Sequence, residues 1–189
     1  MSRYVARTLR SDDFSTLMEM ESALFGSAGE GELGRYYIRL CCDFFKDSCF
    51  IVEAAGKPAG YLLSFARGKE VYCTTLAVLP AYQGSRATHT LLRAFVGSIL
   101  GWAESCWFTV EEDNHAARAL HAMLGAKEIE VRPDFYGTGH PRIISRIDRE
   151  AFLALRARFE KVGLVERPSG AAEPRPADGG GMASAAALA

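Results

Sequence analysis

The clearest pattern of hydrophobic and polar positions lies between residues 71 and 99. An apolar, β-branched run covers residues 71–79 and stops at Pro80, which predicts a buried strand. A short polar turn follows, and from about Ser85 apolar residues recur at helical spacing, which predicts a helix. The residues of this helix predicted to face the core are Leu92, Phe95, Val96 and Ile99.

A strand, a tight turn and a helix in this order form an anion-binding geometry. The start of a helix carries backbone N–H groups without partners and the positive end of the helix dipole. The turn contains the small residues Gly84, Ser85 and Ala87, so a phosphate can approach the backbone closely. The Walker motif and the dinucleotide motif are both absent from it. The sequence therefore predicts a phosphate-binding turn of another kind.

The rest of the chain alternates between strand and helix patterns. Strands are predicted over residues 4–9, 49–54, 59–65, 106–110, 127–132 and 142–148, and helices over 14–25, 35–45, 115–124 and 150–162. The expected apolar stripe of the second helix is Tyr36, Tyr37, Leu40, Cys41 and Phe44, and that of the last helix is Phe152, Leu155 and Phe159. This order predicts a mixed α/β fold with a hairpin-rich first half.

The length of 189 residues fits one domain, and 49% hydrophobic residues suffice for a core. We expect one domain over residues 1–164. Residues 165–189 are mostly Ala, Gly and Pro without an aromatic residue, so we expect a disordered tail there. Residues 26–34 contain four glycines and are predicted to form a loop.

Charge and cysteine usage narrow the function classes. The net charge of −1 gives no attraction to nucleic acid or to an anionic membrane. No apolar run approaches the roughly 18 residues of a membrane span, and the N-terminus lacks the apolar core of a signal peptide. The five cysteines show no CxxC and no metal-ligand spacing with histidine. We therefore expect a soluble cytoplasmic protein with reduced thiols and no metal.

Four segments together resemble the GNAT superfamily of acyl-CoA N-acyltransferases. RTLRSDDFSTLMEMESALF is similar to that family's first strand and helix. LAVLPAYQGSRATHTLL resembles its pyrophosphate-binding segment, V-x-P-x-[YF]-[QR]-G-x-G-x-[GA]-x-x-L-L. VEEDNHAARALHAMLGA resembles its fifth strand and following helix, and EVRPDFYG ends in a tyrosine where many members place a general acid. The order and spacing of all four agree over roughly Tyr4 to Asp148.

The resemblance implies a GNAT-like fold and activity. The expected sheet is mixed, mostly antiparallel and of about seven strands, with flanking helices and splayed fourth and fifth strands. The expected reaction moves an acetyl group from acetyl-CoA to a primary amine by direct attack through a tetrahedral intermediate. The expected partner is a small-molecule or peptide amine. The first strand and helix also resemble the branch that acetylates ribosomal-protein N-termini. A homodimer is left open.

The resemblance also assigns donor-binding residues. A backbone N–H near Ala77 or Val78 is expected to hold the oxyanion. The expected contacts of the acyl donor are Leu76, Ala77, Val78, Gln83, Gly84, Ser85, Arg86, Ala87, Thr88 and Asn114. Arg86 and Thr88 replace the two later glycines of the family's loop. Either Arg86 points outward and the turn still binds phosphate, or the turn is distorted and binds weakly.

The proton-transfer residues are less constrained. The resemblance makes Tyr136 the candidate general acid, because a phenol is protonated at neutral pH; the alternative is an aromatic packing residue beside Phe135. Asn114 either binds a pantetheine amide or only caps a helix. A general base is sought among the carboxylates Glu70, Glu111 and Glu128, with Tyr72 nearby, or in a water chain.

The histidines and one cysteine complete the candidates. His115 and His121 are expected to be surface or helix residues, and His140 lies in the Tyr136 loop. A nucleophilic Cys73 is disfavoured because no histidine partner is evident. Two function classes follow: an acetyl-CoA-dependent N-acetyltransferase, and a non-catalytic acyl-CoA-binding or regulatory module of the same fold.

Overall fold

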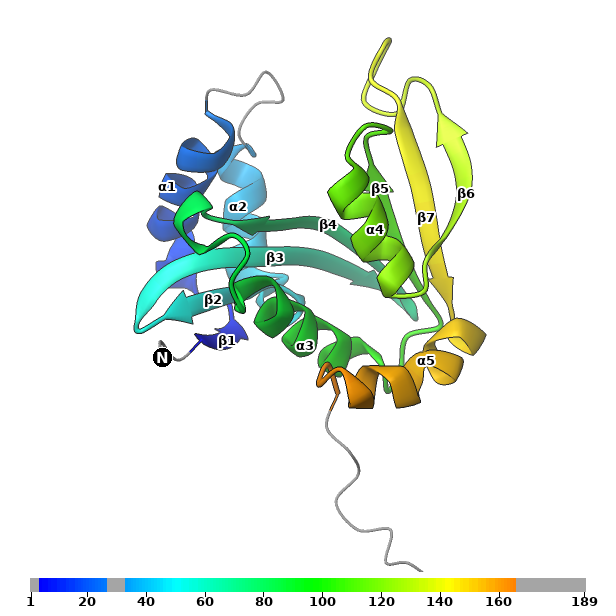
Figure 1. The fold of residues 1–189 in the computed structure, drawn as a ribbon. Coiled ribbons are helices and arrows are strands. Elements are labelled where there is room, and N and C mark those ends of the chain that lie inside the picture. The colour runs from blue at the N-terminus through cyan, green and yellow to red at the C-terminus, as the bar shows by residue number, and fades with distance from the viewer. Residues whose placement is uncertain (1–3, 27–32, 166–189) are drawn as a thin grey trace, which may run out of the picture.

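The structure is a computed structural model and describes residues 4–26 and 33–165 (Figure 1). The expected tail, apart from Val165, and most of the glycine-rich loop lie outside these residues. The elements are β1 (Tyr4–Thr8), α1 (Phe14–Phe25), α2 (Arg35–Asp43), β2 (Phe50–Ala54), β3 (Lys57–Arg67), β4 (Glu70–Val78), α3 (Ala87–Ile99), β5 (Ser105–Val110), α4 (His115–Met123), β6 (Lys127–Arg132), β7 (Arg142–Asp148) and α5 (Arg149–Lys161). This is the predicted order.

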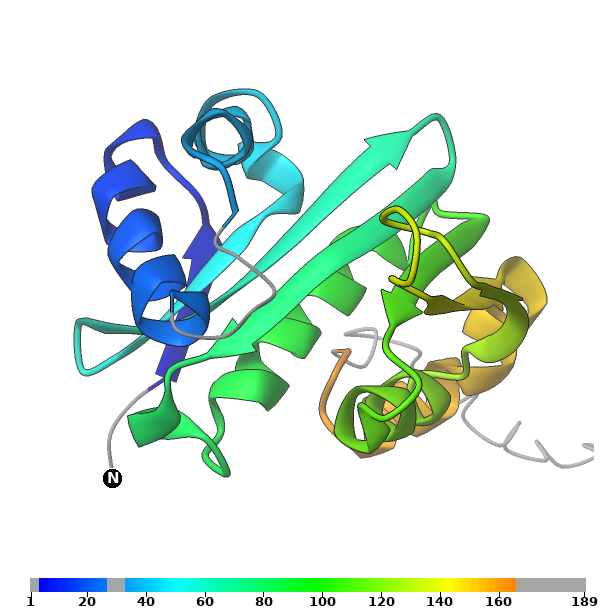
Figure 2. The same ribbon diagram turned by 90° about the horizontal axis from the view of Figure 1, so that it is seen from above.

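The strands form one open sheet between two layers of helices. The strand order is β1-β2-β3-β4-β5-β7-β6, and every neighbouring pair is antiparallel except β4 and β5, which are parallel. A parallel pair needs a crossover connection, and α3 provides it. Helices α1 and α2 cover one face, and α3, α4 and α5 cover the other (Figure 2). The predicted mixed, mostly antiparallel sheet is confirmed.

The parallel pair β4–β5 separates after a short contact. Pairing runs only from Glu70↔Ser105 to Cys73↔Phe108, and beyond it the two strands diverge (Figure 1). At the same place the register of β4 against β3 shifts, which leaves Thr74 as an extra residue. Such a β-bulge bends and twists its strand, so β4 turns away from β5 there. We call the resulting opening, between residues 74–78 and 109–110, the fork; it confirms the predicted splay.

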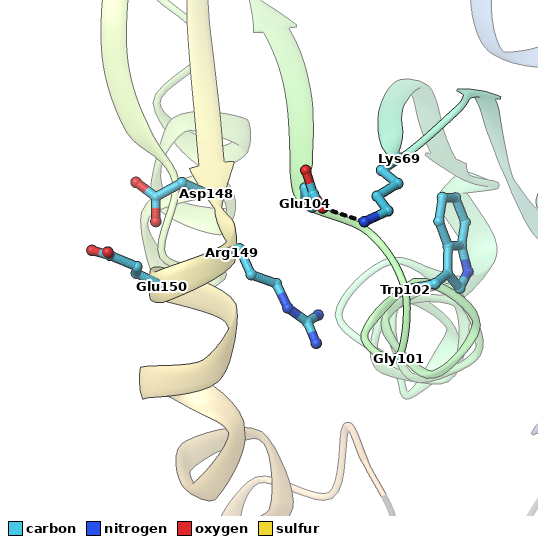
Figure 3. Close-up of a pocket in the computed structure, with 7 residues that line it drawn as sticks. All are labelled: Lys69, Gly101, Trp102, Glu104, Asp148, Arg149 and Glu150. Atoms are coloured by element: carbon cyan, nitrogen blue, oxygen red, sulfur yellow. Dashed lines mark hydrogen bonds and ion pairs between the residues drawn. The ribbon is translucent and has the colours of Figure 1, made fainter.

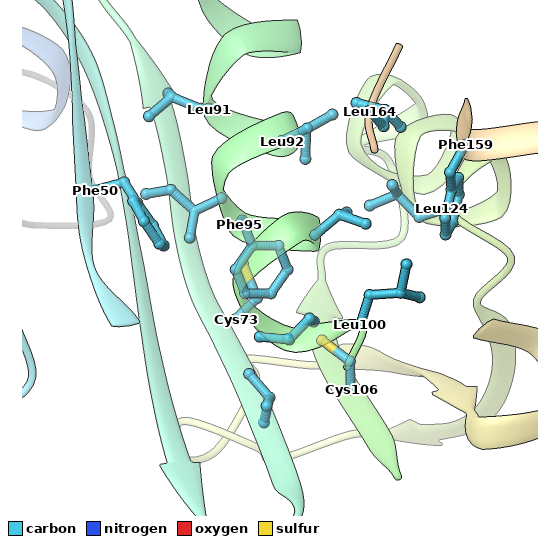
Figure 4. Packing of buried hydrophobic residues seen from close by; sticks show 14 of the residues in the cluster. Phe50, Cys73, Leu91, Leu92, Phe95, Leu100, Cys106, Leu124, Phe159 and Leu164 are labelled. Carbon is cyan, nitrogen blue, oxygen red and sulfur yellow. The ribbon is translucent and has the colours of Figure 1, made fainter. Parts of the chain in front are cut away.

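The larger core lies between the sheet and helices α3, α4 and α5 (Figure 4). All four residues predicted to face inward from α3 are buried, as are Phe152 and Phe159 of α5. A second core lies between the sheet and helices α1 and α2. All five cysteines are free and buried, as expected for reduced thiols. None of the helices in residues 4–26 and 33–165 has the length and apolar content needed to cross a membrane.

The predicted apolar stripe of α2 is partly wrong. Tyr36 and Phe44 are 79% and 77% exposed, whereas Ile38, Cys41 and Cys42 are fully buried. Ile38, Cys41 and Cys42 stand three and four residues apart, the spacing of one helix face. Apolar residues surround this short helix, so periodicity alone could not decide which of two adjacent faces meets the core.

The end of α5 is fixed by a Schellman motif. Gly163 has a φ of 73°, a left-handed conformation that suits glycine. The Leu164 N–H donates to the Phe159 carbonyl at 2.8 Å, and the Gly163 N–H donates to the Glu160 carbonyl at 3.2 Å. This turn places Leu164, which is 1% exposed, in the larger core with Leu92 (Figure 4). Leu164, which follows α5, is therefore part of the packed domain.

We expect Leu164→Ala to lower the free energy of unfolding by about 2–4 kcal/mol, because it leaves a cavity in the core. The matched control is Leu153→Ala, since Leu153 lies on α5 but is 54% exposed, and its cost should stay below about 0.5 kcal/mol. Urea denaturation measures both. Equal losses in the two variants would contradict the docking of Leu164.

Candidate active site

The connection from β4 to α3 is held in shape by its own hydrogen bonds. A 3₁₀ turn covers Pro80–Tyr82. The Ser85 N–H donates to the Tyr82 carbonyl at 3.2 Å, and the Ser85 hydroxyl donates to that carbonyl as well. The same hydroxyl accepts from the Ala87 N–H at 3.2 Å. The Gln83 side chain ties the turn to β4 by donating to the Val78 carbonyl at 3.3 Å.

Four backbone amides in this connection remain without a protein acceptor. In the described part of the chain, the N–H groups of Gly84, Arg86, Thr88 and His89 donate to no other residue. Thr88 and His89 lie in the first turn of α3, where the helix dipole is positive. Unpartnered amides at a helix start are suited to an anion. We call residues 83–89 the amide turn.

Arg86, which stands where the family motif has a glycine, does not strain the backbone of the amide turn. The residue that needs a left-handed backbone is Gly84, whose φ is 71°, a conformation disfavoured for side chains other than glycine. Arg86 has φ −75° and ψ −3°, which any L-residue adopts. Its side chain is exposed. An arginine at this position therefore does not distort the backbone of the turn.

The edge of β4 at the fork presents two more amides. The Leu79 N–H donates to the Ala59 carbonyl at 2.9 Å, on the β3 side. Because backbone groups alternate in direction along an antiparallel strand, the Ala77 amide also faces β3. The amides of Leu76 and Val78 therefore face the fork. The predicted donors were Leu76, Ala77 and Val78. The backbone amides of Leu76 and Val78 point into the fork, as a donor to a ligand there requires, whereas that of Ala77 points to β3.

Hydroxyl groups gather on one side of the fork. The Tyr72 and Thr109 hydroxyls lie 2.9 Å apart across β4 and β5. Burial, together with a smaller effect of the neighbouring Tyr136 phenol, raises the pKa of Tyr72 to about 12. The fold thus brings Tyr136 from the β6–β7 connection to the side chain of Tyr72. Tyr136 is 60% exposed, and the Arg142 guanidinium lies 5.0 Å from its ring centre.

The three carboxylates considered as general bases all have arginine partners. The pairs are Glu70 with Arg67 at 3.0 Å, Glu111 with Arg142 at 2.8 Å and Glu128 with Arg118 at 2.8 Å. The hydrogen bond from Arg118 lowers the pKa of Glu128, which makes that carboxylate a weaker base. The geometry favours the interpretation of these residues as paired surface charges.

Asn114 caps α4, as one of the two predicted roles requires. Its side-chain oxygen accepts from the Ala117 N–H at 3.0 Å. The amide nitrogen of the side chain has no partner among the described residues and stays available as a donor. The two roles considered for Asn114 therefore use different atoms and are compatible.

Cys73 is placed unfavourably for a nucleophile. Its side chain belongs to the larger core and is 8% exposed. Burial raises the pKa of the Cys73 thiol to about 12, so the reactive thiolate is scarce at neutral pH. This agrees with the low weight that the sequence gives to a cysteine mechanism.

His121 lies on helix α4, as expected, and its side chain is partly buried there. The imidazole lies 4.5 Å from the ring of Phe108, the residue of β5 in the last pair before the fork. Its Nδ1 is buried without a partner among the described residues, and so is the hydroxyl of Ser145, which pairs with Phe108 from β7. Burial lowers the pKa of His121 to about 4. His121 stands three residues before Leu124, which is 1% exposed, and this helical spacing was the available signal.

We expect the burial of His121 to make the protein less stable in acid. Below about pH 6.5 the unfolded chain protonates this imidazole, whereas the folded chain does so only near pH 4. Protons therefore favour the unfolded state, and stability falls as the pH drops through this window. The expected loss is about 1–2 kcal/mol, reduced by the partial exposure of the ring.

Urea denaturation at pH 7 and pH 4.5 measures this effect. The loss should shrink in His121→Phe and persist in His140→Phe, because His140 is exposed. An unchanged pH dependence in His121→Phe would contradict the buried neutral imidazole.

Comparison with known proteins agrees with this geometry. An open seven-stranded sheet with flanking helices, in which the parallel strands β4 and β5 splay apart, matches the GNAT fold. The Acetyltransferase (GNAT) family matches residues 14–126, so the chain belongs to this family. Among curated proteins, none matches this chain by sequence.

Solved structures share the fold at low sequence identity. The ribosomal-protein-S18-alanine N-acetyltransferase of Escherichia coli has a TM-score of 0.64 and 21% identity, over 77% of this chain and 94% of that one. Naa50 of Arabidopsis thaliana, solved with a bisubstrate analogue, has a TM-score of 0.65 and 15% identity, over 77% and 98%. Diaminobutyrate acetyltransferase of Paenibacillus lautus, solved with its substrate and coenzyme A, has a TM-score of 0.61 and 19% identity, over 77% and 95%.

Proposed function

We propose that this acetyltransferase moves an acetyl group from acetyl-CoA to a primary amine of a small molecule or a peptide. The observation that carries the proposal is the set of four unpartnered amides in the amide turn, which leads from the strand that borders the fork into α3. Family membership supports acetyl transfer, and solved neighbours bear names of peptide and small-amine acetyltransferases. That the acceptor is a primary amine is likewise proposed.

The amide turn fits the pyrophosphate of the donor. The amides of Gly84, Arg86, Thr88 and His89 supply donors, and a Cβ built on Gly84 would meet nothing within 4 Å, so the approach is open. The exposed Arg86 guanidinium adds a charged contact to phosphate oxygens. Gln83, Ser85 and Ala87 use their groups to hold the shape of the turn. Asn114 lies across the fork, at the start of α4. We expect the amide nitrogen of its side chain to contact the pantetheine arm of the donor.

The fork supports direct transfer. The amides of Leu76 and Val78 stabilise the oxyanion that forms when the neutral amine attacks the thioester carbonyl. As the carbon–sulfur bond breaks, Tyr136 gives its phenolic proton to the departing thiolate. The proton that leaves the amine passes to water. Tyr72, held by Thr109, places the Tyr136 phenol.

An amine panel tests the proposal directly. Purified protein is incubated with acetyl-CoA and pooled peptide N-termini, amino acids or polyamines, and both free thiol and acetylated product are measured. We expect thiol release in step with product for at least one pool. Coenzyme A binding without amine-dependent release from any pool would support the non-catalytic module instead.

We expect Gly84→Pro to weaken coenzyme A binding at least about tenfold, because proline removes an N–H and cannot adopt a φ of 71°. Calorimetry measures the affinity. The matched control is Gly68→Pro, since Gly68 also has a positive φ, 60°, but lies in the β3–β4 turn. Unchanged affinity in a folded Gly84→Pro variant would count against this donor site.

We expect Tyr136→Phe to lower turnover by roughly 10²–10⁴-fold, the range for a positioned general acid. Affinity for acetyl-CoA should hardly change, because the phenol acts as charge builds on sulfur. The control is Tyr36→Phe, whose ring is 79% exposed on α2. Wild-type turnover in Tyr136→Phe would make this tyrosine a packing residue, and a parallel loss of affinity would make it a wall of the donor channel.

A further inference from the structure

Helix α5 is bound to α3 at both of its ends. At the start of α5, Arg149 Nη1 donates to the carbonyls of Leu100 at 2.6 Å and Ala103 at 3.2 Å, just past the end of α3. Arg149 reaches across a pocket of about 710 Å³ to make these bonds (Figure 3). After α5, the Val162 carbonyl accepts from His89 Nε2 at 2.8 Å, in the first turn of α3. The two helices, 13 residues each, therefore run in opposite directions with both ends joined.

His89 belongs to the amide turn and to this contact at once. Its backbone N–H is one of the four unpartnered amides, while its side chain reaches toward the end of α5. The imidazole lies against Gly163, where a built Cβ would stand 3.8 Å from His89 Cε1. The side chain of His89 thus links the end of α5 directly to the first turn of α3.

The acceptor of this hydrogen bond is held in place. The Schellman motif uses the carbonyls of Phe159 and Glu160 and leaves that of Val162 for His89. Leu164 and Phe159 are 1% and 0% exposed, so the residues on both sides of Val162 are anchored in the core. His89 therefore bonds to a fixed point and not to a loose chain end.

The first turn of a helix needs such support. Its amides have no intrahelical partners, and helix ends fray. Donors that are already oriented bind an anion with less loss of conformational freedom. A bond from the first turn of α3 to a rigid neighbour therefore favours anion binding at the amide turn.

We propose that His89 is a positioning residue: through its hydrogen bond to the Val162 carbonyl, α5 holds the amide turn in the orientation that binds the pyrophosphate of the acyl donor. This inference rests on the proposed function, because it requires donor binding at the amide turn. It assigns to the C-terminal helix a role in donor affinity besides its role in stability.

Calorimetry with coenzyme A tests the proposal in four proteins: wild type, His89→Ala, His89→Gln and Arg149→Ala. Loss of one exposed hydrogen bond should weaken the affinity of His89→Ala about three- to tenfold. Glutamine keeps an N–H donor of similar reach, so His89→Gln should recover most of the affinity. Arg149→Ala loosens the opposite end of α5, so it should lower the melting temperature and bind coenzyme A as wild type does.

Steady-state kinetics give a second readout. KM for acetyl-CoA should rise in His89→Ala by the same factor as Kd, with kcat and the KM of the amine unchanged, because His89 acts on donor binding alone.

The outcomes separate this inference from the proposed function. A wild-type protein that does not bind coenzyme A overturns both. A wild type that binds, with His89→Ala binding equally well, overturns only the role of His89. Equal weakening in His89→Ala and Arg149→Ala also overturns it, because general loosening of α5 would then explain the effect. Failure of His89→Gln to recover affinity would mean that the hydrogen bond is not what matters.

Discussion

The functional architecture depends on the end of pairing between β4 and β5. Four residue pairs hold these parallel strands together, and the bulge at Thr74 ends the contact. Beyond Cys73 the strands diverge, so the amides of Leu76 and Val78 lose their neighbour strand. Such groups need water or a ligand as a partner. Near the same divergence, Tyr136 of the β6–β7 connection lies against Tyr72 of β4.

The two sides of the fork differ in chemistry because successive residues of a strand face opposite sides. Thr109 points toward the hydroxyl of Tyr72 and, beyond it, Tyr136. Phe108, one residue earlier, faces α4 and the buried imidazole of His121. One side is therefore rich in hydroxyl groups. The other is apolar, with an imidazole kept neutral by burial.

Two helices, α3 and α5, position the amide turn beside the core. Helix α3 crosses from β4 to β5 and begins at the amide turn, so its position decides where the unpartnered amides point. Helix α5 joins both ends of α3 through Arg149 and Val162. The C-terminal segment thereby connects the packing of the core to the geometry of the proposed donor site.

The sequence by itself determined the element order, the buried face of α3 and the turn that holds the amides, because these follow from local periodicity and from Gly84. It also identified the family, since four motifs agreed in order and spacing. The tertiary structure decided which face of α2 is buried, that Glu70, Glu111 and Glu128 are paired, and that His121 lies beside Phe108. It also decided that φ > 0 falls on Gly84 and not on Arg86. The buried face of α2, the pairing of Glu111 with Arg142 and the contact of His121 with Phe108 depend on residues that are far apart in the chain, and no local pattern encodes such contacts.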